Sequence, residues 1–155
     1  MMPEEFKVVI ADTSCFILLD KIDALHILHE LFNEIITSEK VANEFGKSLP
    51  AWIKIVEVKD QIFLKKLLEQ VDAGEASAIA LASELQPSLL IIDDLKGRKL
   101  AEQLHLTYTG TLGVFLKARQ EKIITSLRPY FEKIREINFH ISYQLLDDIL
   151  KQVED

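Results

Sequence analysis

Two short apolar runs that end in acidic residues dominate the pattern of hydrophobic and polar positions. Residues 8–12 read Val-Val-Ile-Ala-Asp, and residues 89–94 read Leu-Leu-Ile-Ile-Asp-Asp. Short apolar runs of this kind are typical of strands that are buried on both faces in a parallel sheet. Open parallel sheets bind ligands beyond the carboxyl ends of their strands, so the pattern predicts a functional site at the acids that close both runs.

Helical and strand-like periodicities alternate along the rest of the chain until residue 127, after which the spacing is only helical. Asp23 and Ser38 are each predicted to cap a helix, and Gly46 to end the helix that Ser38 begins. This alternation predicts an α/β fold: a three-layer α/β/α sandwich with a mainly parallel central sheet and a C-terminal helical extension over about 127–155. The expected strands are 7–11, 34–37, 53–58, 89–92 and 107–109, and the expected helices are 13–21, 23–31, 39–45, 60–70, 76–85, 95–104 and 111–121.

Composition narrows the class of protein. The chain has 155 residues, of which 48% are hydrophobic, and we expect one globular domain over residues 1–155. The apolar runs are too short for a membrane span, and the acidic first residues do not favour a secretory signal. The one cysteine, Cys15, excludes an internal disulfide framework and favours a core thiol in a cytoplasmic protein. The net charge of −7 argues against salt-driven nucleic-acid binding but is compatible with an acidic cluster that holds metal.

Asp12 is the first candidate for a functional acid, and two interpretations are open. Its carboxylate caps the following helix, or it serves a site in which the hydroxyls of Thr13 and Ser14 orient it or a metal-bound water. Asp93 and Asp94 provide one acid more than a helix cap needs. Because adjacent side chains at a strand end do not point the same way, we expect one of them to face inward and the other to act as a cap or a supporting group.

Glu44 and Glu75 are weaker candidates when each is considered alone. Glu44 lies three residues after Val41, beside the predicted buried face of its helix, and a solvated glutamate is the simpler interpretation. Glu75 follows Asp72 by three residues, which is the spacing of a capping box. Gly74 would nevertheless allow backbone or substrate to come close to Glu75.

Taken together, the acids indicate metal chemistry. A hard divalent cation such as Mg²⁺ prefers oxygen ligands and keeps several waters, so it needs only a few carboxylates. Two such ions can stabilise the attacking and the leaving oxygen of a phosphodiester displacement. The sequence contains no Walker A loop and no dinucleotide-binding glycine pattern, and His26 and His29 have no evident third ligand. The absence of a second aspartate two residues after Asp12 weakens a haloacid-dehalogenase-type phosphatase interpretation.

Four motifs occur in a recognisable order. They are Asp-Thr-Ser at 12–14, Val-x-x-Glu at 41–44, Gly-Glu-Ala-x-Ala-Ile at 74–79 and Ile-Asp-Asp-x-x-Gly-Arg-x-x-Ala at 92–101. This order resembles the PIN-domain family, most closely its small prokaryotic branch of VapC-like proteins, and Gly-Thr-Leu-Gly at 110–113 also looks like that branch. The resemblance covers roughly residues 7–125, and the tail resembles a helical extension of the same branch. One departure is that common VapC-like sequences have a single aspartate in the last motif.

The resemblance implies an endoribonuclease that hydrolyses RNA phosphodiesters with Mg²⁺ or Mn²⁺. Many relatives are toxins that a small antitoxin protein holds inactive, and many are dimers. RNA, an antitoxin-like protein and a second copy of the chain are therefore the implied partners, with no membrane involved. The implied catalytic acids are Asp12, Glu44, Glu75, Asp93 and Asp94. Of these, Asp12, Glu44, Glu75 and either Asp93 or Asp94 would bind the metal, and Asp94 aligns slightly better with the family motif than Asp93. The implied supporting residues are Thr13, Ser14 and Thr111.

Positive charge for an RNA substrate would come from residues that follow the last acid pair, namely Lys96, Arg98 and Lys99, and from residues of the next helix, namely Lys117, Arg119 and Lys122. Solvated helix faces are an equally simple interpretation of these charges. Trp52 would stack on a base or, more simply, anchor the core. Two other functions stay open: a PIN-like module without activity that acts through a protein partner, and an acid-cluster phosphohydrolase that acts on small phosphate esters.

Overall fold

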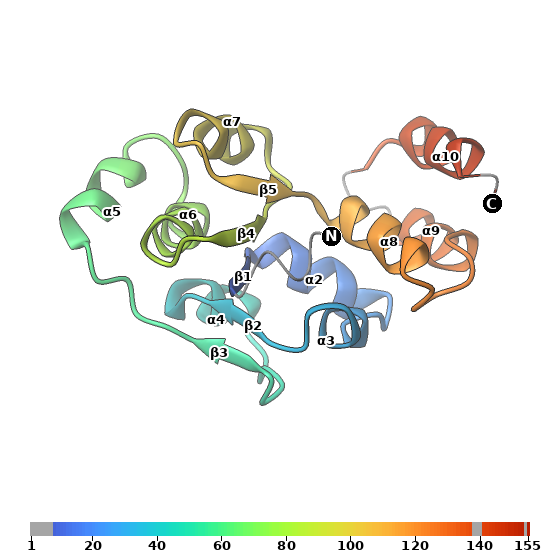
Figure 1. Ribbon diagram of the computed structural model, residues 1–155, viewed down its shortest axis with the longest axis horizontal. Coiled ribbons are helices and arrows are strands. Elements are labelled where there is room, and N and C mark those ends of the chain that lie inside the picture. Colours follow the sequence, from blue (N-terminus) through green and yellow to red (C-terminus); the bar gives the residue numbers. More distant parts are fainter. Residues whose placement is uncertain (1–7, 138–140, 154) are drawn as a thin grey trace.

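Five parallel strands form the centre of the molecule (Figure 1). The computed structural model describes residues 8–137, 141–153 and 155. Every strand pair in this part is parallel, which confirms the predicted three-layer fold. Across the sheet the order is β3 (Ile53–Ile55), β2 (Ile35–Thr37), β1 (Val8–Ala11), β4 (Ser88–Ile91) and β5 (Thr107–Thr109).

Helices cover both faces of the sheet. Successive strand residues point to opposite faces, so Val9 lies in one hydrophobic core and Ile10 in the other. The helices that build the first core are α2 (Thr13–Lys21), α3 (His26–Phe32), α8 (Thr111–Gln120), α9 (Arg128–Glu136) and α10 (Tyr143–Gln152). Those of the second core are α5 (Gln61–Leu68), α6 (Ala73–Glu84) and α7 (Leu95–Gln103), while α4 (Glu39–Phe45) contacts both α2 and α6.

The ends of the helices test the predicted caps. Ser38 begins α4 by accepting a backbone N–H at 3.0 Å, and Gly46 ends that helix in the left-handed region with φ +77°, both as predicted. The predicted cap at Asp23 is wrong. Asp23 has φ +57° and lies in the tight turn between two helices, and α3 begins only at His26.

The strand expected over 53–58 is shorter in the structure. β3 ends at Ile55, which pairs with Thr37, the last residue of β2. The neighbouring chain then turns into α4, so residues beyond Val56 have no strand to pair with. The alternating residues 53–58 therefore predicted a strand correctly, but the length of that strand is set by β2, with which it pairs.

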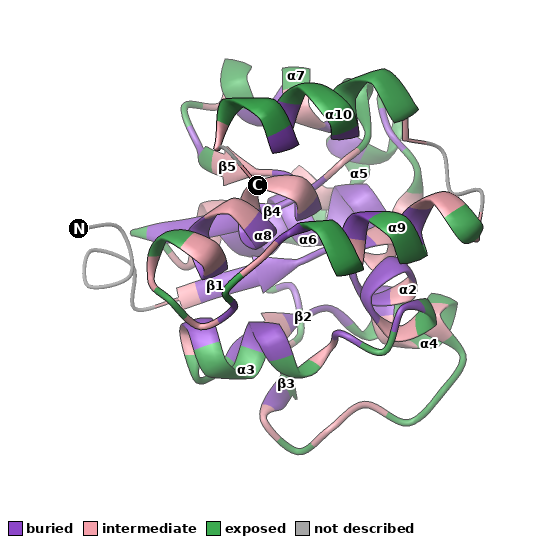
Figure 2. Ribbon diagram, turned by 90° about the vertical axis from the view of Figure 1, so that its right-hand side faces the viewer, coloured by how far each residue is buried: buried purple, intermediate pink, exposed green. Residues whose placement is uncertain are grey.

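The C-terminal tail forms two helices that pack onto the first core. Phe131 of α9 and Leu146 and Leu150 of α10 are buried there. Figure 2 shows much of the outward side of α10 in green, as exposed, whereas the central strands are largely purple, as buried. Among the described residues no helix is both long enough and apolar enough to cross a membrane.

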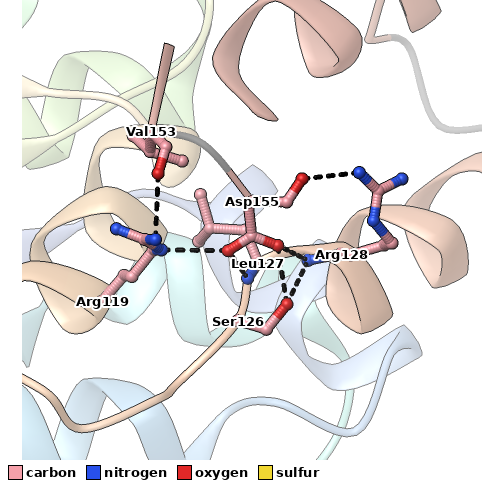
Figure 3. A network of polar contacts seen from close by, with 6 residues as sticks. All are labelled: Arg119, Ser126, Leu127, Arg128, Val153 and Asp155. Atoms are coloured by element: carbon pink, nitrogen blue, oxygen red, sulfur yellow. Dashed lines mark hydrogen bonds and ion pairs between the residues drawn. The ribbon is translucent and has the colours of Figure 1, made fainter. Parts of the chain in front are cut away.

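Asp155 holds this tail against the loop before α9 (Figure 3). Its buried carboxylate accepts a hydrogen bond from Arg119 Nε at 2.9 Å and from the Leu127 backbone N–H at 2.9 Å. Ser126 Oγ and the Arg128 backbone N–H donate to the same carboxylate. Burial alone would raise the pKa of Asp155, but these four donors outweigh it and lower the pKa to about 2.

Candidate active site

The predicted acids meet where the strand order of the sheet reverses. From β1 the chain proceeds through β2 to β3 on one side, and β4 and β5 lie on the other side. Such a switch point leaves a crevice at the carboxyl ends of the two central strands. A cleft of about 450 Å³ lies there. It is lined by Asp12, Thr13, Ser14, Ile17, Glu44, Asp72, Glu75, Asp93 and Asp94.

Asp12 follows β1 and stands in the N-cap position of α2 without capping it through its side chain. The residue is only 5% exposed, and its Oδ1 atom is buried with no hydrogen-bond partner. Burial raises the pKa of Asp12 from 3.8 to about 7, against the pull of the nearby Thr13 backbone N–H. The charges of Asp72, Glu44 and Asp93 raise it further. The interpretation of Asp12 as a simple helix cap is thus not supported by its contacts.

Glu75 lies in the first turn of α6 and lines the same cleft as Asp12. Asp72 caps this helix by accepting the Glu75 backbone N–H at 3.0 Å, as the spacing predicted. The Glu75 side chain, however, is buried, and its Oε1 atom has no hydrogen-bond partner. Burial first, then Asp72, Asp94 and Asp12, raise the pKa of Glu75 to about 9.

Asp93 and Asp94 divide two roles between them. Asp93 faces inward: Ser14 Oγ donates to its carboxylate at 3.2 Å, and the Thr111 backbone N–H and Oγ1 donate at 2.7 and 2.6 Å. Asp94 caps α7 by accepting the Lys96 backbone N–H at 3.1 Å. This is the division expected for two adjacent acids, and both side chains line the cleft.

Glu44 reaches the cleft from the last turn of α4. It is an exposed residue whose Oε1 atom accepts a hydrogen bond from Thr13 Oγ1 at 2.7 Å. A helix-face glutamate therefore joins the other acids through a contact between distant parts of the chain. Thr13, Ser14 and Thr111 all donate hydrogen bonds to acids of the cleft.

Three glycines make room for three of the acids. At each of them, a Cβ atom would approach or overlap a carboxylate oxygen of the site. Only a residue without a side chain leaves that space to the carboxylate. The pairs are Gly74 with Glu44 Oε1, Gly97 with Glu75 Oε1 at 2.9 Å, and Gly110 with Asp93 Oδ1 at 3.0 Å.

The donor set fits a hard divalent cation. Oxygen atoms line the cleft, and the buried Asp12 Oδ1 and Glu75 Oε1 are left without donors, a condition that is costly for a carboxylate unless a cation or a proton is near. Within the described residues, no three His, Cys, Asp or Glu side chains are arranged so that they would hold one ion as they stand. Metal binding at this place thus requires the carboxylates to draw together.

The basic residues are distributed unevenly around the cleft. Lys96 lines an adjoining pocket, and the Arg98 guanidinium lies over the Tyr108 ring, 5.3 Å from its centre. Lys99, on the same helix, is exposed. By contrast, Lys117 is buried in an ion pair with Glu121 at 2.5 Å. Within the described part of the chain, α7 is therefore the better source of positive charge near the site.

Two other candidate residues, Trp52 and Cys15, belong to the first core, whereas Asp72 belongs to the cleft. Trp52 stacks on His29 with ring centres 4.8 Å apart and packs against the first core. Cys15 is fully buried, and burial raises the pKa of its thiol. Asp72 was expected only as a helix cap, yet it also lines the cleft and raises the pKa of both Asp12 and Glu75.

A comparison with protein families agrees with this geometry. A family model described as a PIN domain matches residues 8–155 of the chain. The match includes β1, the four acid-bearing motifs and both C-terminal helices. No curated protein matches the chain significantly.

Proposed function

The chain belongs to the PIN-domain family, whose members are in general nucleases, and on this premise we propose that it is a metal-dependent endoribonuclease of the VapC-like type. The observation that carries the proposal is the pair of buried carboxylates, Asp12 and Glu75, whose partnerless oxygens lie in one cleft at the switch point of the sheet. Such an arrangement is costly in an apoprotein and useful to one that binds a cation.

Each acid has a proposed role in holding Mg²⁺ or Mn²⁺. Asp12 and Glu75 supply the buried oxygens, and Glu44 closes the site from α4. For the fourth ligand the sequence motif favours Asp94, but the hydrogen bonds favour Asp93, because Ser14 and Thr111 hold its carboxylate in a fixed orientation. A bound cation would neutralise charge that develops on the phosphodiester and favour the ionisation of a water.

Substrate contacts are proposed for α7, which carries Lys96, Arg98 and Lys99. The stacked Arg98 is the best placed of the three to meet a phosphate, since the Tyr108 ring restrains its guanidinium. On the resemblance to the VapC-like branch alone, the proposal extends to a cytoplasmic toxin with a small antitoxin-like partner and to a homodimer.

The decisive experiment is a paired assay. Wild-type protein and the Asp12→Asn variant are each incubated with single-stranded RNA in Mg²⁺, in Mn²⁺ and in EDTA. We expect cleavage only by the wild type and only with metal. Equal cleavage by both proteins would identify a contaminating nuclease, and turnover of a small phosphate ester without RNA cleavage would replace the proposal with a phosphohydrolase.

A further inference from the structure

Three buried hydroxyls near the acidic cleft make two sets of hydrogen bonds, which the backbone links because Thr37 and Ser38 are consecutive residues. Thr37 Oγ1, at the end of β2, donates to the Ala11 carbonyl at 2.9 Å. Ser38 Oγ, the next residue, lies 2.6 Å from Ser77 Oγ of α6. Ser77 Oγ in turn donates to the Gly74 carbonyl at 2.9 Å. None of the three hydroxyl residues is more than 4% exposed; we call Thr37, Ser38 and Ser77 the hydroxyl relay.

The direction of each bond in the relay follows from counting hydrogens. A serine hydroxyl has one hydrogen to donate. Ser77 uses its hydrogen on the Gly74 carbonyl, so Ser38 must be the donor of the bond between the two serines. Ser38 Oγ also accepts the Val41 backbone N–H at 3.0 Å. Every hydroxyl hydrogen is thereby used, which gives a buried polar network a single preferred arrangement.

The relay joins three of the elements that present acids to the cleft, namely β1, α4 and α6. Ala11 immediately precedes Asp12, and Gly74 immediately precedes Glu75. Ser38 begins α4, whose last turn carries Glu44. Two contacts therefore pin α4 to α6: the pair of serines at the start of α4, and at its end Glu44, which fills the space that a Cβ would take at Gly74.

We infer that the hydroxyl relay is a positioning device for the metal centre: it limits how far β1, α4 and α6 can separate, so that their acids can draw together around one cation. This inference rests on the proposed function. None of the three hydroxyls lines the acidic cleft, so they act through the acids and not on the substrate. A purely structural relay would affect folding stability but leave metal affinity unchanged.

Ser77→Ala is the variant of choice because it removes two bonds of the relay and leaves the cap of α4 in place. Ser88→Ala is its matched control. Ser88 is also a buried serine, and its Oγ donates to the Ala82 carbonyl of the same helix at 2.8 Å, but it begins β4, at the end opposite to the cleft. Thr37→Val is the second test variant, since it keeps the side-chain shape and removes the hydroxyl.

The measurement is the dissociation constant for Mn²⁺, from calorimetric titration of the full chain, with urea unfolding as the measure of stability. We expect Ser77→Ala and Thr37→Val to weaken Mn²⁺ binding about tenfold, the typical effect of losing a group that orients metal ligands, and Ser88→Ala to bind as the wild type does. Wild-type affinity in both relay variants, or an equal loss in Ser88→Ala, would overturn the inference while leaving the nuclease proposal intact. Failure of the wild type itself to bind Mn²⁺ would overturn both.

Discussion

Replacing the proposed metal ligand Asp12 with asparagine is expected to stabilise the metal-free protein. Burial is the main cause that raises the pKa of Asp12 from 3.8 to about 7. Ionised Asp12 therefore disfavours the folded state, and the change in pKa corresponds to about 4 kcal/mol of unfolding free energy. This figure is an upper bound, because water entering the cleft and the new amide of asparagine each reduce it.

The sign of the effect depends on pH. Below about pH 4 the carboxyl is protonated in both the folded and the unfolded chain and has no effect on stability. Between about pH 4 and about pH 7 the unfolded chain has released this proton while the folded chain still holds it, so the wild type loses stability as the pH rises and the variant does not. We expect the stability advantage of Asp12→Asn in EDTA to grow by up to about 4 kcal/mol between about pH 4 and about pH 8.

Urea unfolding followed by the fluorescence of Trp52, the one tryptophan, measures this difference at each pH. The matched control is Asp60→Asn, because Asp60 is an exposed aspartate that caps α5, and asparagine caps equally well. Its effect is expected to stay within about 0.5 kcal/mol at both pH values. An advantage of Asp12→Asn that does not change with pH, or that shrinks as the pH rises, would refute the argument from burial.

Three further predictions follow from the site and its surroundings. Gly74→Ala is expected to weaken Mn²⁺ binding about tenfold by displacing Glu44, while urea unfolding shows unchanged or slightly higher stability, because alanine is the better helix former. Calorimetry is expected to show Mn²⁺ affinity rising from about pH 6 to about pH 9, since protons held by Asp12 and Glu75, with pKa values of about 7 and about 9, compete with the metal. Asp155→Asn is expected to lower the unfolding free energy at neutral pH by about 2 kcal/mol, as its lowered pKa implies, with the difference lost as the pH falls through about 2 and with Mn²⁺ affinity unchanged.

The central strands and the acids that follow them were predictable from the sequence, because burial on both faces leaves an uninterrupted apolar run that a carboxylate ends visibly. Asp12 and Asp93 could be placed at the same sheet edge for this reason. The inward side chain of the Asp93–Asp94 pair could not be identified in advance. It depends on donors from Ser14 and Thr111, which are 79 and 18 residues away along the chain.

The remaining parts of the site depend on tertiary contacts that the sequence pattern hardly predicts. Glu44 is an exposed helix residue by its spacing, and only the approach of α4 to Gly74 brings it into the cleft. The spacing of Asp72 is fully explained by its role as a helix cap, so the sequence gives no sign that it also raises the pKa of Asp12. Arg119 was one of the basic residues considered for contact with RNA, but its partner is Asp155, 36 residues later.

The repulsion between the acids of the cleft explains the need for the hydrogen bonds that hold the surrounding elements in place. Carboxylates that repel one another and lack donors tend to move apart or to take up protons, and the raised pKa values of Asp12 and Glu75 show the second tendency. The first is opposed by the hydroxyl relay and by the donors to Asp93 and Glu44. A cation that binds only the folded state would reverse the balance and stabilise the protein by about 2.7 kcal/mol at a concentration one hundred times its dissociation constant. The ionised carboxylate of Asp12 therefore lowers the stability of the metal-free protein and raises its affinity for metal. Substitutions of Asp12 are expected to increase metal-free stability and to decrease metal affinity.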